Sequence, residues 1–175
     1  YLEGQISYAQ PGDDDTLHVL CSTQHPTEMQ QMVAHCLGWR AHRVSVECRR
    51  MGGAFGGKES QSAQWACLAA LLAVNTGKPV KLRLDRDDDM VATGKRHPYR
   101  YQWESAFDDS GRLLGLKLEF AADCGHSADL SGPVNDRTIC HIDNAYYLDA
   151  LALKSLRCRT NRVSNTALRG FGGPQ

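Results

Sequence analysis

The chain has 175 residues, 42% of them hydrophobic, and a mean hydropathy of -0.44, values typical of a water-soluble globular protein. Lys plus Arg and Asp plus Glu both number 20, so the formal net charge is zero. This balance argues against a nucleic-acid-binding surface, and no apolar run is long enough to cross a bilayer. The length suits one domain with a substantial core, or two small lobes.

The N-terminal part of the sequence predicts a hairpin followed by a helix. Residues 3–10 and 16–22 have the composition of strands, and the turn PGDDD joins them. A helix is expected over Pro26–Leu37, with Gly38 as its end. Its inward face should consist of four apolar residues spaced along the helix: Met29, Val33, Cys36 and Leu37.

A glycine-rich loop with the sequence MGGAFGGKES occupies residues 51–60. The Val-rich alternation of residues 43–50 predicts a strand that leads directly into it. A long helix is expected from Ser60 to Thr76, with Gly77 as its cap. Residues 81–84 follow as a short strand.

The C-terminal part predicts a second group of strands. Residues 99–107 and 112–122 flank the turn DDSG, which is a strong hairpin signal. Residues 123–142 combine turn residues with a possible short helix, and residues 150–159 predict a further strand. The element order is neither strictly βαβ nor all-β. It indicates an α+β fold with a mostly antiparallel sheet and helices packed on it.

The sequence contains 7 cysteines but no C-x-x-C pair, which argues against a zinc ribbon or an iron–sulfur cluster within this chain. An odd number of scattered cysteines predicts reduced thiols packed as small apolar side chains. A reducing, cytoplasmic location is therefore expected. The chain starts at Tyr1 and stops in GFGGPQ, so we expect a piece of a larger polypeptide that is truncated at both ends.

The glycine loop is a near match to a phosphate-binding P-loop. Gly52, Gly57 and Lys58 fit the G-x-x-x-x-G-K spacing, but Glu59 stands where a magnesium-binding hydroxyl is required. Glycines allow a backbone to approach a ligand closely. The alternative is a tight strand-to-helix turn that binds nothing. Phe55 favours a ligand, because an aromatic ring inside such a loop loses solvation energy unless it packs.

A second element of the same kind, ALRGFGGPQ, closes the chain at residues 167–175. Two glycine loops that each carry a phenylalanine suggest two walls of one ligand pocket. Two unrelated turns would also account for the spacing.

Five ordered segments carry a resemblance to a known family: STQHPTEMQQMVAHCLG, RRMGGAFGGKES, LDRDDDMVATGKRHPY, NDRTICHIDNAY and SNTALRGFGGPQ. Together they resemble the xanthine dehydrogenase and aldehyde oxidase family of molybdenum hydroxylases. The resemblance covers essentially the whole chain, residues 1–175, as the first part of the molybdenum-cofactor (molybdopterin)-binding domain. Two residues depart from the family pattern, Ala54 in place of a usual Gly and Leu168 in place of a common Phe.

The resemblance implies catalytic and substrate-binding roles for two charged residues. Glu59 would hydrogen-bond to a purine and Arg137 would stabilise the negative charge that builds on its ring. Phe171 would lie against the face of the substrate ring. Without the family context, a surface ion pair of Arg137 with Asp136 or Asp143 would be the better interpretation.

The resemblance also implies a set of cofactor contacts. Gln24 would hydrogen-bond an oxo group of the molybdenum, and Phe55, Gly56 and Arg169 would offer backbone N–H groups near the metal. None of them is a direct metal ligand, because the pterin dithiolene supplies the sulfurs in this family. FAD and 2Fe–2S clusters are expected in other parts or subunits. The general-base glutamate of the family lies farther along the full chain.

The function that the resemblance implies is oxidation of hypoxanthine and xanthine to urate. The alternatives are an aldehyde- or N-heterocycle-oxidising member of the family, a P-loop-like nucleotide binder and a non-catalytic interaction module. The expected partners are a purine substrate, the remainder of the molybdenum domain, and iron–sulfur and flavin domains or subunits, with no nucleic acid and no membrane. The 175 residues alone are expected to be inactive and to carry no molybdenum.

Overall fold

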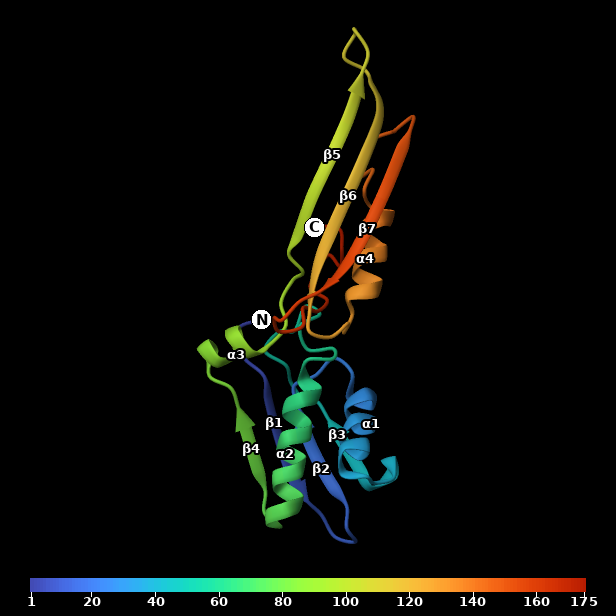
Figure 1. The fold of residues 1–175 in the computed structure, drawn as a ribbon. Coiled ribbons are helices and arrows are strands. Elements are labelled where there is room, and N and C mark those ends of the chain that lie inside the picture. Colours follow the sequence, from blue (N-terminus) through green and yellow to red (C-terminus); the bar gives the residue numbers. More distant parts are fainter. The chain divides into compact units, whose positions relative to one another are not determined.

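The computed structural model describes all residues, 1–175, and divides the chain into two compact units, Tyr1–Thr93 and Gly94–Gln175. Each unit contains one sheet, with several helices beside the first sheet and the single helix α4 beside the second (Figure 1). The predicted α+β class is confirmed. Three of the five strand pairings are antiparallel and two are parallel. Of the two alternatives that the chain length allowed, two lobes are observed.

The sheet of the first unit has four strands in the order β3-β2-β1-β4. They are β1 (Ile6–Pro11), β2 (Leu17–Cys21), β3 (Val44–Glu47) and β4 (Val80–Arg83). The turn PGDDD joins β1 and β2 as predicted, and β1 also pairs antiparallel with β4, while β2 and β3 are parallel. The strand expected over residues 43–50 was too long, since β3 ends at Glu47.

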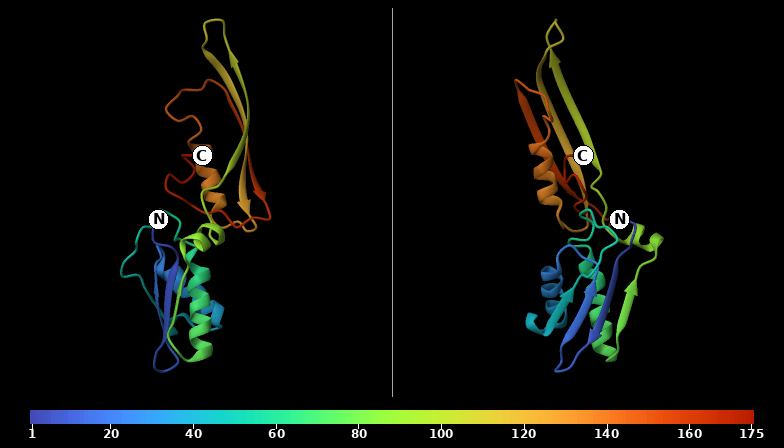
Figure 2. Two further views of the ribbon diagram at one scale, coloured as in Figure 1. Left: turned by 90° about the vertical axis from the view of Figure 1, so that its left-hand side faces the viewer. Right: turned by 180° about the vertical axis from the view of Figure 1, so that it is seen from behind.

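Helices α1 (Pro26–Leu37) and α2 (Ser62–Thr76) pack on the same face of this sheet, as Figures 1 and 2 show. Both end at a glycine in the left-handed conformation, Gly38 with φ 67° and Gly77 with φ 64°. An alanine stripe of α2 is fully buried: Ala66, Ala69, Ala70 and Ala73. These residues recur at three- and four-residue spacing, so their small side chains form one face that can lie close to the sheet.

The inward face of α1 differs from the prediction at two positions. Met29 and Val33 are buried as expected, whereas Cys36 is exposed and Ala34 is buried. All seven cysteines are free thiols, but Cys36 and Cys140 are exposed, so the expected packing of every thiol as an apolar side chain is wrong for these two.

Two short helices were not predicted, the 3-10 turn η1 (Ala41–Arg43) and α3 (Arg86–Ala92). The side chain of Asp85 caps α3 by accepting the N–H of Asp88 at 2.8 Å. Asp89 is fully buried, and its carboxylate accepts the backbone N–H of Gln5 at 2.6 Å and the hydroxyl of Thr93 at 2.9 Å. Asp89 therefore ties α3 to the N-terminal segment.

Replacement of Asp89 by Ala should destabilise the chain by about 3 kcal/mol. The change removes the acceptor of the buried Gln5 N–H and of the Tyr1 hydroxyl, and each group left unsatisfied costs about 1–3 kcal/mol, whereas the Thr93 hydroxyl keeps the backbone carbonyl of residue 89. Asp87→Ala is the matched control, because Asp87 lies on the same helix but is exposed. Urea unfolding of both variants measures the difference, and equal losses would show that the buried contacts contribute nothing.

The sheet of the second unit has the order β5-β6-β7. Its strands are β5 (Tyr99–Phe107), β6 (Leu113–Gly125) and β7 (Leu151–Arg159), with helix α4 (Ser131–Cys140) beside them. The predicted hairpin at DDSG is confirmed, since β5 and β6 pair antiparallel, and β7 adds parallel to β6. The Tyr99 hydroxyl donates to the side-chain oxygen Oδ1 of Asn135 at 2.8 Å and links the sheet to α4.

No helix in the structure combines the length and apolar character needed to cross a membrane.

Candidate functional site

The first glycine loop connects β3 to α2, as predicted, although α2 begins at Ser62 instead of Ser60. Phe55 has φ 54° and Gly56 has φ 92°, and the Gly57 N–H donates to the Ala54 carbonyl at 2.9 Å. Positive φ at both central residues with this hydrogen bond is the pattern of a type I′ turn. Ala54 itself does not have positive φ, so its substitution for glycine causes no backbone strain.

The second glycine loop repeats this geometry. Phe171 has φ 44° and Gly172 has φ 94°, and the Gly173 N–H donates to the Gly170 carbonyl at 3.0 Å. A phenylalanine at positive φ is an uncommon conformation that costs about 1–3 kcal/mol. Such strain clusters at functional sites. The same strained turn in two separate units therefore favours two ligand loops over two unrelated turns.

Lys58 does not face outward as a phosphate-binding lysine would. Its side chain is 0% exposed, and its ammonium group lies 2.8 Å from a Glu3 carboxylate oxygen and 2.9 Å from the Ser22 hydroxyl. Burial alone raises the pKa of Glu3, but the hydrogen bonds from Lys58 and Ser22 outweigh it and hold that pKa below its usual value. Because a P-loop lysine must reach the nucleotide phosphates, this geometry argues against a nucleotide site.

Gln24 is fixed against the first loop. Its backbone N–H donates to the Lys58 carbonyl at 2.9 Å, and its side-chain carbonyl accepts the Gly56 N–H at 2.9 Å. The Gly56 N–H, expected to face a cofactor, is thus used by Gln24 in this structure. The side-chain NH₂ of Gln24 and the N–H of Phe55 have no hydrogen-bond partner. Both are donors that this region can offer to a ligand.

Glu59 follows directly, in the segment between the turn and α2. It is half-buried, and no side chain or backbone group of the structure pairs with its carboxylate. Phe55 is 54% exposed, so the packing partner that its ring needs does not come from the loop itself. The side-chain NH₂ of Gln24, the exposed ring of Phe55 and the carboxylate of Glu59 are therefore three groups at the first glycine loop without a hydrogen-bond or packing partner in the first unit.

In the second unit, Arg137 lies in the last turn of α4 and is exposed. Its Nε donates to Nε2 of His141. The alternative of a surface ion pair with Asp136 or Asp143 is not formed, and Asp136 instead lies 3.9 Å from Arg157. The guanidinium of Arg137 therefore carries a charge that no carboxylate of this chain neutralises.

The second glycine loop packs on the same helix. The Thr138 hydroxyl donates to the Gly172 carbonyl at 3.1 Å, and a Cβ on Gly172 would lie 2.5 Å from the Val134 carbonyl oxygen. Only glycine permits this approach, which brings the segment of Phe171 to the helix that carries Arg137. Sequence reasoning missed Thr138, because its contact with a residue 34 positions away leaves no local signal.

Arg169 precedes the second turn and is exposed. Its carbonyl accepts a hydrogen bond from the Arg96 guanidinium at 2.6 Å, and its backbone N–H has no partner. Arg96 therefore supports the loop from the start of the unit, and the Arg169 N–H has no partner within this chain.

The predicted site residues fall into two groups. The first unit holds Gln24, Phe55, Gly56 and Glu59, and the second holds Arg137, Arg169 and Phe171. Each group is brought together within its own unit. That the two loops form two walls of one pocket stays a prediction.

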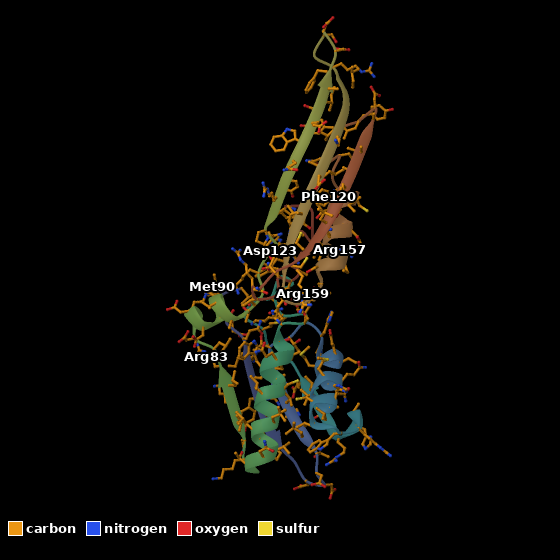
Figure 3. All side chains as sticks on the ribbon, in the orientation of Figure 1. Arg83, Met90, Phe120, Asp123, Arg157 and Arg159 are labelled. Carbon is orange, nitrogen blue, oxygen red and sulfur yellow. The ribbon has the colours of Figure 1, made fainter.

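Two cavities lie elsewhere. One of about 880 Å³ is lined by residues of the first sheet and its edges, among them Glu3, Tyr8 and Arg49. Another of about 410 Å³ lies at the start of α4 beside Arg157 and Arg159, which Figure 3 shows on β7. No predicted site residue lines either cavity. The structure contains no cluster of three or more His, Cys, Asp or Glu side chains suited to a metal ion.

Comparisons with known proteins agree on one family. The family described as "Molybdopterin cofactor-binding domain" matches residues 1–175. A xanthine dehydrogenase from Calliphora vicina is 45% identical over 175 residues, and the nicotinate hydroxylase hnxS from Emericella nidulans is 42% identical over 176. Both matches cover 100% of this chain and 13% of the relative's length.

Solved structures show the same fold. The aldehyde oxidoreductase from Desulfovibrio gigas superposes with a TM-score of 0.86 at 26% identity, covering 98% of this chain and 19% of that one. The quinoline 2-oxidoreductase from Pseudomonas putida 86 gives a TM-score of 0.84 at 26% identity, covering 98% of this chain and 22% of that one.

Proposed function

Since the chain belongs to the molybdopterin cofactor-binding domain family, we propose that it is part of a molybdenum hydroxylase that oxidises hypoxanthine and xanthine to urate. The chain spans 13% of the length of the xanthine dehydrogenases that it matches, so the activity is that of a larger protein. Within it, these residues contribute cofactor-binding loops and groups that orient the purine.

The available donors fit a cofactor that carries oxygen and anionic groups. When bound, the molybdenum cofactor would supply the two-electron oxidation that converts a ring C–H to C–OH. The side-chain NH₂ of Gln24 and the backbone N–H groups of Phe55 and Arg169 are unpaired donors in the structure. Hydrogen bonds from such preorganised donors to oxygen acceptors would hold the cofactor and fix its orientation.

The observation that carries the purine assignment is the guanidinium of Arg137, which no carboxylate neutralises. A purine gains negative charge on its ring oxygens as the ring carbon is attacked, and a guanidinium aimed at such an oxygen stabilises that charge. Glu59 would hydrogen-bond across a ring nitrogen and fix the orientation and tautomer of the purine. Phe171 would stack on the ring face.

Two further features of the proposal concern the electron carriers and the cellular location of the larger protein. FAD and 2Fe–2S clusters in other domains or subunits would carry the electrons away. The seven free thiols support a cytoplasmic location.

Oxidation of a different N-heterocycle is the second candidate. The nicotinate hydroxylase matches almost as well as the xanthine dehydrogenases, at 42% against 45% identity. Arg137 could hold the carboxylate of a pyridine carboxylic acid as well as a purine oxygen. Glu59 distinguishes the two, because a second negative group beside a substrate carboxylate would repel it.

The test is a substrate panel on the full-length, molybdenum-loaded enzyme and its Glu59→Ala variant. Wild-type kcat/KM should be highest for xanthine and hypoxanthine. Glu59→Ala should lower it about 10-fold or more for purines, the loss of one charge-assisted hydrogen bond, and should leave an aldehyde substrate unchanged. Higher wild-type activity on nicotinate, with a gain in Glu59→Ala, would replace the purine assignment by the second candidate.

A further inference from the structure

Arg137 is held by an acceptor that carries no charge. Its Nε donates to Nε2 of His141, four residues later. An imidazole nitrogen can accept a hydrogen bond only if it bears no proton, so this contact requires neutral His141 with its proton on Nδ1. The bond uses one edge of the guanidinium and leaves both terminal NH₂ groups without a partner.

The position of His141 is fixed by the same helix end that supports the second glycine loop. His141 caps α4, and its backbone N–H donates to the Thr138 carbonyl at 3.2 Å. The Thr138 side chain binds Gly172. Arg137, His141 and the turn of Phe171 are thus anchored to one helical turn.

Because the hydrogen-bond partner of Arg137 is a neutral imidazole, the guanidinium keeps its positive charge. A carboxylate at this position would orient the guanidinium equally well, but it would also cancel much of the charge that a substrate oxygen needs. Two carboxylates close in sequence, Asp136 and Asp143, form no ion pair with Arg137. Only His141 binds its Nε, and His141 orients the guanidinium without neutralising it.

We propose that His141 is a positioning residue for substrate recognition, which fixes the guanidinium of Arg137 for a purine oxygen while preserving its positive charge. This inference rests on the proposed function of Arg137. It adds a specificity determinant at a residue that does not itself touch the substrate.

Three variants of the full-length, molybdenum-loaded enzyme separate orientation from charge. His141→Leu removes the acceptor and should raise the KM for xanthine about 2- to 10-fold, the effect of one hydrogen bond, with a smaller change in kcat. His141→Gln retains a neutral acceptor and should restore KM to within about twofold of wild type. His141→Asp orients but neutralises Arg137, and should lower kcat for xanthine about 10-fold.

Each variant is also assayed with an aldehyde substrate, because a general loss of enzyme activity would lower turnover of both substrates. Asp143→Asn is the control variant for a substitution on the surface near Arg137. Failure of His141→Gln to rescue KM, or equal losses for xanthine and the aldehyde, would show that His141 is merely structural. His141→Gln and His141→Asp keep the comparison possible if His141→Leu does not fold. If Arg137→Met fails to separate the two substrates, the proposed function itself is wrong. If Arg137→Met separates them but the three His141 variants behave alike, only the present inference fails.

Discussion

Replacement of Arg137 by Met in the full-length enzyme should lower kcat/KM for xanthine about 10- to 150-fold. Methionine keeps the length of the side chain but removes the charge-assisted hydrogen bond, which is worth about 1.5–3 kcal/mol. An aldehyde has no ring oxygen on which charge accumulates, so its kcat/KM should change less than about threefold. Steady-state kinetics with both substrates on one preparation, corrected for molybdenum content, measures the difference.

Arg157→Met is the matched control for this experiment. Arg157 lies in the same unit, on β7, and its nearest carboxylate is Asp136 at 3.9 Å. Its loss should affect both substrates little and equally. If Arg137→Met reduces xanthine and aldehyde turnover to the same extent, the guanidinium supports the helix end and does not select purines.

Replacement of Lys58 by Met should destabilise the chain by about 3 kcal/mol and loosen the first glycine loop. Breaking a buried ion pair costs about 3–5 kcal/mol because a charge stays behind without its partner. The lower end applies here, since the Glu3 side chain is 37% exposed and water can solvate it in part. Lys78→Met, at an exposed lysine that forms no ion pair, should cost less than about 0.5 kcal/mol.

Urea unfolding of the two lysine variants decides this prediction, and similar costs would contradict it. The pH dependence gives an independent readout. The pKa of Glu3 is lower in the folded state than its ordinary 4.5, so its contribution is present above pH 4.5 and is lost as the pH falls through the folded-state pKa. Wild type should lose this stability on acidification, and Lys58→Met should lose less of it, because Ser22 and the Gly52 N–H still donate to Glu3.

The sequence predicted the bounds of those helices and strands that are delimited by turn or capping residues directly beside them. Tyr99–Phe107 and Pro26–Leu37 have their predicted bounds, because a hairpin turn follows the first and Pro26 and Gly38 delimit the second. Helix α3 was missed, since the acidic run DRDDDM shows no apolar periodicity. The sequence feature that could have predicted α3 is its N-cap, Asp85, whose side chain accepts the N–H of Asp88 three residues later.

Contacts between distant residues explain what local patterns could not predict about the site. The sequence suggested Lys58 as a cation for a ligand, yet its partner Glu3 lies 55 positions away. Likewise, Gln24 uses the Gly56 N–H across 32 positions. The identity of the site residues came from the resemblance to a family. Their surroundings, which decide whether each group is free to bind, came from the fold.

The left-handed conformations of Phe55 and Phe171 lower the folding stability of the chain at the two loops that we propose bind the ligand. Glycine or asparagine would adopt the conformation of Phe55 and Phe171 at little energetic cost, and each phenylalanine forfeits about 1–3 kcal/mol there. A sequence selected for stability alone would therefore have neither ring at these positions. Substitutions chosen to raise the melting temperature would therefore replace both phenylalanines, and they would remove the two rings at the loops that we propose contact the ligand. In these two loops, a substitution that raises the melting temperature is therefore expected to lower the activity of the enzyme.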